Sequence, residues 1–158
     1  MAPKAPAAAV DDKDVPLHRI PTHSTIVWCD CEMTGLDVDY DALLEVCVVL
    51  TDEKLNEIKR MQLVVRTEQR VIDTMNDWCK KHHTKSGLVK ECLESTLSVA
   101  QVDDKLWELL EEYKVDNAVL AGNSVSYDRS FLKKYCPRFH ARLHYRNIDV
   151  SSFKEVLK

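Results

Sequence analysis

Asp30 and Glu32 stand two residues apart in the stretch VWCDCEMTGL (27–36). The segment Thr25–Cys31 is rich in β-branched and aromatic residues, which favours a β-strand whose residues i and i+2 share a face. Two carboxylates side by side at the centre of a sheet repel each other and lose hydration, so they would hold a proton or require a cation. Hard divalent ions such as Mg²⁺ or Mn²⁺ prefer oxygen ligands, and two such ions can promote phosphodiester cleavage.

The spacing of this pair carries no signal by itself. Three other acidic pairs, at 12/14, 37/39 and 39/41, have the same spacing but lie in polar segments. Only the apolar strand around Asp30 and Glu32 distinguishes them, and a solvent-facing strand end is the ordinary alternative interpretation.

The elements around the pair predict a layered α/β fold. Leu43–Leu50 is a nearly continuous apolar run, typical of a strand covered on both faces, and Ile58–Val65 is predicted as a third strand. Short connections between these strands indicate an antiparallel meander. Residues 67–95 are predicted as short helices.

The second half alternates helices and strands. Ser98 and Gln101 form a capping box at the start of a helix whose apolar stripe reaches Tyr113. A strand at 117–122, a helix from about residue 127, a strand at 146–150 and a helix from Ser151 follow. The predicted fold is therefore α/β, with a mixed five-stranded sheet flanked by helices.

Composition narrows the class of protein. The 158 residues suit one domain, predicted over 26–158 after a flexible N-terminal tail over 1–25. No apolar run approaches the roughly 20 residues that span a bilayer, so no membrane role is expected. Six cysteines without a CxxC pair indicate reduced thiols and a cytoplasmic protein, or a mitochondrial one if a presequence was removed.

Charge argues against a protein that grips long duplex DNA, because the net charge is −4. The acids are unevenly distributed, however. Between Asp128 and Asp149 there are six basic residues and no acid, which leaves room for a local anion site.

Three motifs in order, DCEMTGLD (30–37), AGNSVSYDRSFL (121–132) and HYRNIDVSSFKEV (144–156), resemble the oligoribonuclease branch of the DEDD-type 3′-to-5′ exonucleases. The resemblance extends from about Ile26 to Lys158. It implies an RNase H-like fold, a homodimer, and removal of nucleotides from the 3′ end of very short RNA with two divalent ions, Mg²⁺ or Mn²⁺.

The resemblance also implies roles for individual residues. Without it, an exposed helix face would explain His83, and the helix dipole would explain Asp128. The family pattern makes Asp30, Glu32 and Asp128 the catalytic metal ligands. It makes Leu36 a wedge against the bases, and Trp78 and His83 the lining of the base pocket. Ser124, Arg146 and Ser151 would contact the 5′ phosphate, and Tyr145 would reach the neighbouring subunit's site.

The sequence departs from the family pattern near its C-terminal end. The family completes its site with a His, the general base, and a fourth Asp five residues apart. All six histidines, at 18, 23, 82, 83, 140 and 144, precede the expected position, and no acid follows Glu155. Two hypotheses follow: a truncated metal-dependent exoribonuclease, or a non-catalytic relative that binds short nucleotides or dimerises with a complete partner.

Overall fold

A computed structural model describes residues 25–158, so the predicted N-terminal tail lies outside the described residues except for Thr25. One five-stranded sheet has the order β3-β2-β1-β4-β5. The first three strands pair antiparallel, and β4 and β5 run parallel to β1, so the predicted mixed sheet is confirmed. The strands are β1 (Ile26–Met33), β2 (Leu43–Thr51), β3 (Glu57–Val64), β4 (Ala118–Gly122) and β5 (Leu143–Asp149).

The helices follow the predicted order, with one addition. Three short helices occupy the predicted region, and Ser98 caps the next helix with the expected reciprocal bonds to Gln101. A one-turn helix between the last two strands was not predicted. The helices are α1 (Gln69–Ile72), α2 (Asp77–Ser86), α3 (Leu88–Glu94), α4 (Val99–Glu112), α5 (Ser126–Tyr135), α6 (Pro137–His140) and α7 (Val150–Val156).

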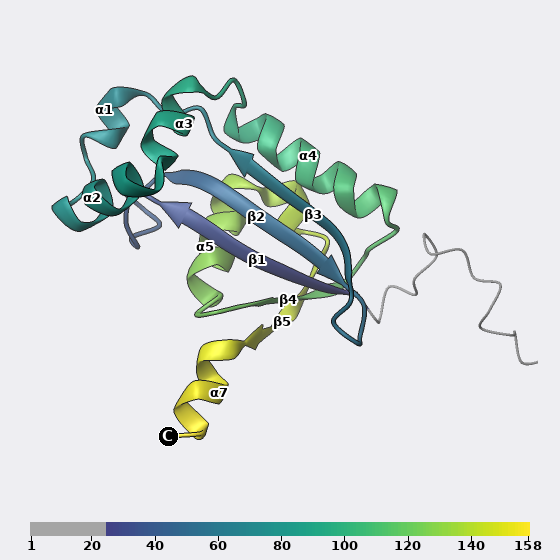
Figure 1. Cartoon of the computed structure of the whole chain (residues 1–158). Helices are drawn as coiled ribbons and strands as arrows, with labels where there is room; N and C mark the ends of the chain where they lie inside the picture. Colours follow the sequence, from purple (N-terminus) through teal and green to yellow (C-terminus); the bar gives the residue numbers. More distant parts are fainter. Residues whose placement is uncertain (1–24) are drawn as a thin grey trace, which may run out of the picture.

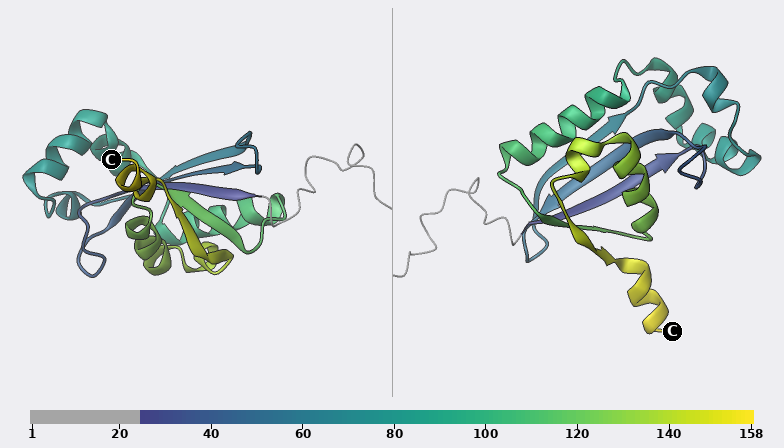
Figure 2. Two further views of the ribbon diagram at one scale, coloured as in Figure 1. Left: turned by 90° about the horizontal axis from the view of Figure 1, so that it is seen from below. Right: turned by 180° about the vertical axis from the view of Figure 1, so that it is seen from behind.

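One face of the sheet carries the main core. In Figure 1, α4 and α5 lie behind the strands, and the view from behind in Figure 2 shows them in front. Val46 and Val48 of β2 pack in the same cluster as Leu106 of α4 and Phe131 of α5. A smaller cluster, which includes Leu44, joins α1, α2 and α3 to the end of the sheet. Apolar burial of this kind is the main stabilising term of the fold.

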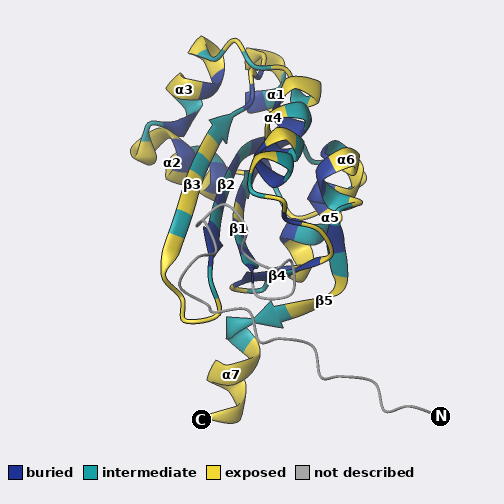
Figure 3. Ribbon diagram, turned by 90° about the vertical axis from the view of Figure 1, so that its right-hand side faces the viewer, coloured by how far each residue is buried: buried dark blue, intermediate teal, exposed yellow. Residues whose placement is uncertain are grey.

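The opposite face of the sheet is open among the described residues (Figure 1). Glu45, Cys47 and Val49 of β2 are only half-buried, whereas Val46 and Val48 are buried. The prediction that this strand is covered on both faces is therefore wrong, because all the described helices that flank it pack on one side or at one end. Figure 3 shows that α7 is likewise largely exposed.

The sheet separates where β1 leaves β4. Those strands pair only from Ile26 to Trp28 on β1. At the end of β4, Gly122 approaches so closely that a Cβ there would lie 2.6 Å from the Cys29 carbonyl oxygen. Beyond this point the edge of β1 is free to meet other groups, and crevices at the carboxyl ends of parallel strands commonly bind ligands.

Candidate active site

Asp30 and Glu32 lie on the open face of β1. They share one face, as predicted, but Asp30 is exposed and 42% of the Glu32 side chain is accessible. The interpretation in which burial makes each charge costly is therefore wrong, and the alternative of a solvent-facing pair agrees with the structure, because no described element covers these side chains. In the sheet register Glu32 faces Glu45 of β2. Burial raises the pKa of Glu45, and the nearby charge of Glu32 raises it further against a hydrogen bond from Gln62.

Asp128 supplies a third carboxylate from α5. Its Oδ1 accepts a 2.8 Å hydrogen bond from the backbone N–H of Cys31, the residue between Asp30 and Glu32. That N–H lies on the edge of β1 that β4 has left. Asp128 is 5% exposed, and burial raises its pKa, with the charge of Asp30 adding to the shift and the Cys31 N–H opposing it. The fold thus brings residues 98 positions apart to one strand end.

The donor set suits a hard cation rather than a soft one, since it consists of carboxylate oxygens. A cation beside Asp128 would relieve the unfavourable charge that raises its pKa. Within residues 25–158, however, no three His, Cys, Asp or Glu side chains are already arranged to hold a metal ion. The carboxylates therefore form a partial site whose side chains must converge on an ion.

A cavity of about 510 Å³ opens beside Glu32. Two of its lining residues are Leu36, on the loop after β1, and Trp78, on α2. Their side chains are 65% and 69% exposed, so neither belongs to the core. The Trp78 ring stacks on His82, with centroids 5.0 Å apart and planes within 4°. The cavity is lined by Cys31, Glu32, Met33, Gly35, Leu36, Asn76, Trp78 and Cys79.

His83 is buried, not solvated as its charged neighbours on α2 would indicate. Its Nε2 donates a 2.9 Å hydrogen bond to the Met33 carbonyl oxygen, because a carbonyl can only accept. Its Nδ1 lies 3.8 Å from Glu32 Oε2 and has no hydrogen-bond partner. His83 therefore fastens α2 to the end of β1 and faces the carboxylate site.

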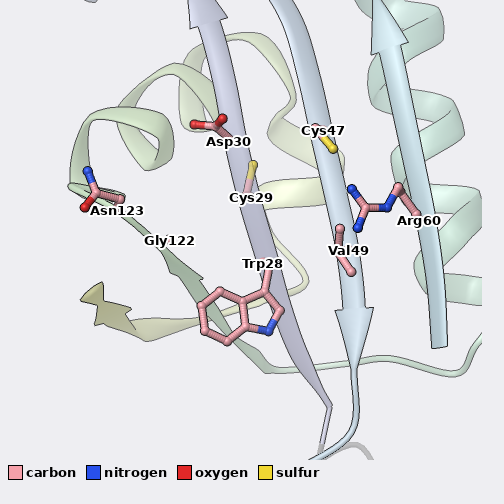
Figure 4. Close-up of a pocket in the computed structure, with 8 residues that line it drawn as sticks. All are labelled: Trp28, Cys29, Asp30, Cys47, Val49, Arg60, Gly122 and Asn123. Atoms are coloured by element: carbon pink, nitrogen blue, oxygen red, sulfur yellow. The ribbon is translucent and has the colours of Figure 1, made fainter. Parts of the chain in front are cut away.

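A second cavity, of about 360 Å³, lies on the open sheet face on the other side of Asp30 (Figure 4). In the view of Figure 4, Asn123 and Asp30 lie on the left of this cavity and Arg60 on the right, and Trp28 and Val49 add apolar side chains to its lining. Arg60 of β3 places a cation at its rim. The carboxylate site thus adjoins the loop between β4 and α5. The lining residues are Trp28, Cys29, Asp30, Cys47, Val49, Arg60, Gly122 and Asn123.

Ser124 and Ser151 meet where β4 and β5 end. Oδ1 of Asp149 accepts hydrogen bonds from the backbone N–H groups of both serines, each 2.9 Å long. The Ser151 hydroxyl also donates to it, at 2.6 Å. A hydroxyl has one proton, so Ser151 must rotate before it can donate to a phosphate. Ser124 adopts a left-handed backbone with φ 55°, a conformation that is uncommon in residues other than glycine.

Arg146 and Tyr145 project from β5. Tyr145 is 75% exposed, and the Arg146 guanidinium lies 5.4 Å from the centroid of its ring. The structure thus links Ser124 to Ser151 through Asp149, but it pairs Arg146 with Tyr145 and not with the serines. Sequence reasoning missed Asp149. Its place before a helix start is a typical N-cap signal that could have revealed it.

The hydrogen bonds that Asp149 accepts from Ser124 and Ser151 should make the stability of the fold depend on pH in the acid range. The bond from the Ser151 hydroxyl, followed by backbone N–H groups, lowers the pKa of Asp149. A lowered folded-state pKa stabilises the fold above the unfolded value of about 3.9, and this contribution is lost as pH falls through the folded pKa. Asn keeps the acceptor oxygen but loses the charge, and hydrogen bonds to a charged acceptor are stronger than those to a neutral one. We therefore expect Asp149→Asn to lower Tm by a few degrees at pH 7, and this difference to shrink below about pH 4.

Thermal melts of wild type and Asp149→Asn between pH 7 and pH 3 measure this effect. Asp39→Asn, which removes the same charge from an exposed loop, is the matched control. Equal melting temperatures of wild type and Asp149→Asn at pH 7 would contradict the assignment.

Comparison with known proteins identifies the family. The Exonuclease family profile matches residues 27–158. The mitochondrial oligoribonucleases of Bos taurus and Homo sapiens are each 42% identical over 135 residues, which cover 84% of this chain and 57% of those proteins. The oligoribonuclease of Azoarcus sp. (strain BH72) is 41% identical over 140 residues, covering 87% of this chain and 76% of the relative. The chain thus spans little more than half the length of the mammalian relatives.

Solved structures agree on the fold. Escherichia coli exonuclease I, in complex with a dA13 oligonucleotide, superposes with a TM-score of 0.64 at 14% identity. The superposition covers 85% of this chain and 30% of that chain. The sheet and its helices therefore have the RNase H-like exonuclease fold that the motifs predicted. None of the described helices is both long and apolar enough to cross a membrane. The chain belongs to the exonuclease family of which the oligoribonucleases are members.

Proposed function

We propose that this protein is a 3′-to-5′ exoribonuclease that degrades very short RNA, from dinucleotides to a few nucleotides, to mononucleotides. The observation that supports this most strongly is the meeting of Asp128 with the Asp30/Glu32 strand end, beside a cavity bounded by Leu36 and Trp78. Carboxylates suited to metal binding and an exposed aromatic surface suited to base stacking then adjoin each other.

Asp30, Glu32 and Asp128 would hold two divalent ions, Mg²⁺ or Mn²⁺. Bound there, such ions supply neutralisation of the scissile phosphate and a lower pKa for the attacking water. The protein's own contribution is orientation: the Cys31 N–H fixes one oxygen of Asp128, and its other oxygen remains for a ligand. The water-activating base is assigned to no residue of 25–158.

The substrate would lie across the end of β1. Leu36 and Trp78 would contact bases, and His83 would complete the pocket wall. Ser124, Arg146 and Ser151 would bind the 5′ phosphate. A phosphate site of this kind would limit substrate length, and a short substrate needs few cations, which is compatible with a net charge of −4. The cytoplasm and mitochondria both remain proposed locations, because relatives include bacterial and mitochondrial enzymes.

We also propose a homodimer in which Tyr145 reaches the neighbouring subunit's site. Its exposed ring supports this, as do exposed Phe153, Val156 and Leu157 near α7. Sedimentation should give about twice the chain mass of 18.2 kDa at micromolar concentration. Tyr145→Ala should keep the mass of a dimer but weaken dinucleotide binding. A wild-type monomer at 100 µM or so would contradict the dimer.

The function is tested with RNA labelled at one end. A 5′-labelled trinucleotide should shorten one nucleotide at a time in Mg²⁺ or Mn²⁺, and a 3′-labelled one should release labelled mononucleotide first. An unlabelled 24-mer competitor should inhibit weakly. Cleavage from the 5′ end, or internal cleavage, would refute the proposed reaction. The non-catalytic alternative predicts that the protein binds RNA without cleaving it. It predicts the same for a variant to which the C-terminal His and Asp of the family pattern have been added.

A further inference from the structure

The loop that carries Leu36 is fixed by a side chain that none of the proposed roles includes. Leu36 has no core around it, since it is 65% exposed. Its position on the cavity that Trp78 also lines therefore depends on the backbone of residues 34–41. One carboxylate, Asp41, closes that loop.

Both oxygens of Asp41 are used within the loop. Its Oδ1 accepts a 2.8 Å hydrogen bond from Thr34 Oγ1, and its Oδ2 accepts a 2.9 Å bond from the Asp37 N–H. Thr34 Oγ1 in turn accepts from the Ala42 N–H at 2.9 Å. Thr34 and Asp37 flank Gly35 and Leu36, so one side chain ties down the chain on both sides of the wedge residue.

Gly35 is needed for the same closure. A Cβ at this position would collide with the Asp41 carboxylate. The loop therefore combines a residue without a side chain with a carboxylate that fills the vacated space, and Leu36 is the next residue along.

Helix α5 secures the loop from outside. The Tyr135 hydroxyl donates a 2.6 Å hydrogen bond to the Asp41 carbonyl, and Lys134 Nζ donates to the carbonyl oxygens of Val38 and Asp39. The same helix carries Asp128, which is bonded to β1. The Leu36 loop and the carboxylate site are thus anchored to one element.

We propose that Asp41 is a positioning residue that holds Leu36 against the bases of a dinucleotide, an inference that rests on the proposed function. Direct contact with substrate does not explain Asp41, because both its oxygens already accept hydrogen bonds and a carboxylate repels an anionic substrate. Its loss should free the loop and weaken dinucleotide binding about as much as the loss of Leu36 itself.

Affinity for a 5′-phosphorylated RNA dinucleotide tests this, measured on the 158-residue chain in Ca²⁺, which takes the same oxygen ligands. Leu36→Ala and Asp41→Ala should each weaken binding about tenfold, since each removes the contact of one leucine side chain. The double variant should bind no more weakly than Leu36→Ala. A 5′-phosphorylated mononucleotide, which offers no second base, should bind all these proteins alike.

Matched variants separate positioning from charge and from folding. Asp39→Asn, in the same loop, should leave dinucleotide affinity within about twofold of wild type. Thr34→Val removes the hydroxyl donor but keeps the shape of the side chain, so it should weaken dinucleotide binding as much as Asp41→Ala does. Thr34→Ser keeps the hydroxyl and should bind the dinucleotide as wild type does. If Asp41→Ala does not fold, the two Thr34 variants still test whether the hydrogen bonds of Asp41 position Leu36.

The outcomes distinguish a failure of the positioning role of Asp41 from a failure of the proposed function. Weaker binding by Leu36→Ala with unchanged binding by both Asp41→Ala and Thr34→Val would overturn the positioning role and leave the proposed function intact. Additive losses in the double variant, or equal losses for the mononucleotide, would also overturn it. Failure of the wild-type chain to bind the dinucleotide would refute the proposed substrate and the inference together.

Discussion

The 158-residue chain should bind a 5′-phosphorylated RNA dinucleotide but cleave it about 10²–10⁴ times more slowly than a chimera that carries the C-terminal His and Asp of an oligoribonuclease relative. The expected factor is the usual contribution of a general base. In the described residues, His83 is the histidine placed beside Glu32: its Nε2 donates to the Met33 carbonyl, and its Nδ1, 3.8 Å from Glu32 Oε2, is the nitrogen left to accept a proton. A fourth carboxylate would also help complete a site in which no three residues are arranged for metal.

Single-turnover cleavage at saturating Mn²⁺ provides the comparison. Changing only the grafted His to Ala should return the chimera to the rate of the short chain, which controls for general stabilisation by the added segment. Equal rates for the short chain and the chimera would mean that His82, His83, His140 or His144 supplies the base.

Asp128→Asn should reduce cleavage by that chimera more than about a hundredfold, while Tm of the metal-free chain stays equal or rises. Loss of a residue that only orients a metal ligand already costs 10–100-fold, and loss of a ligand should cost more. Stability should not fall, because the amide oxygen can still accept from the Cys31 N–H. The substitution also removes a charge that burial disfavours.

Asp103→Asn is the matched control for a buried carboxylate in a helix. Asp103 lies on α4, which carries none of the proposed site residues, and it accepts hydrogen bonds from the backbone N–H groups of Arg138 and Phe139. Its substitution should leave cleavage within about twofold. Retention of more than a tenth of the rate by Asp128→Asn would contradict the ligand role, and a lower Tm would contradict the account of its charge.

The sequence could predict the strands and the main helices because local signals agreed with the fold. The capping box at Ser98 and the apolar run of β2 were sufficient for those elements. The open sheet face could not be predicted, because an apolar run such as Val46–Leu50 does not reveal whether helices will cover one face or two. The sequence therefore left open whether Asp30 loses its hydration or faces solvent, and the structure shows that it faces solvent.

The candidate site was predictable where motifs carried it and not where it depends on long-range contacts. The position of Asp128 beside β1 depends on the separation of β4 from β1. No local sequence pattern predicts this separation. His83 follows two lysines and one histidine, so its burial against Met33 could not be anticipated. Asp41 lies in a polar segment whose spacing carried no signal, and only its hydrogen bonds single it out.

Calorimetric titration of Mn²⁺ into the chain, in the presence of a 5′-phosphorylated dinucleotide, tests the central claim most directly. Asp30, Glu32 and Asp128 are proposed to hold two divalent ions together, so wild type should show saturable binding. Asp30→Asn, Glu32→Gln and Asp128→Asn should each weaken that binding more than about tenfold. Asp39→Asn should bind as wild type does. Unchanged Mn²⁺ affinity in all three site variants would contradict the claim.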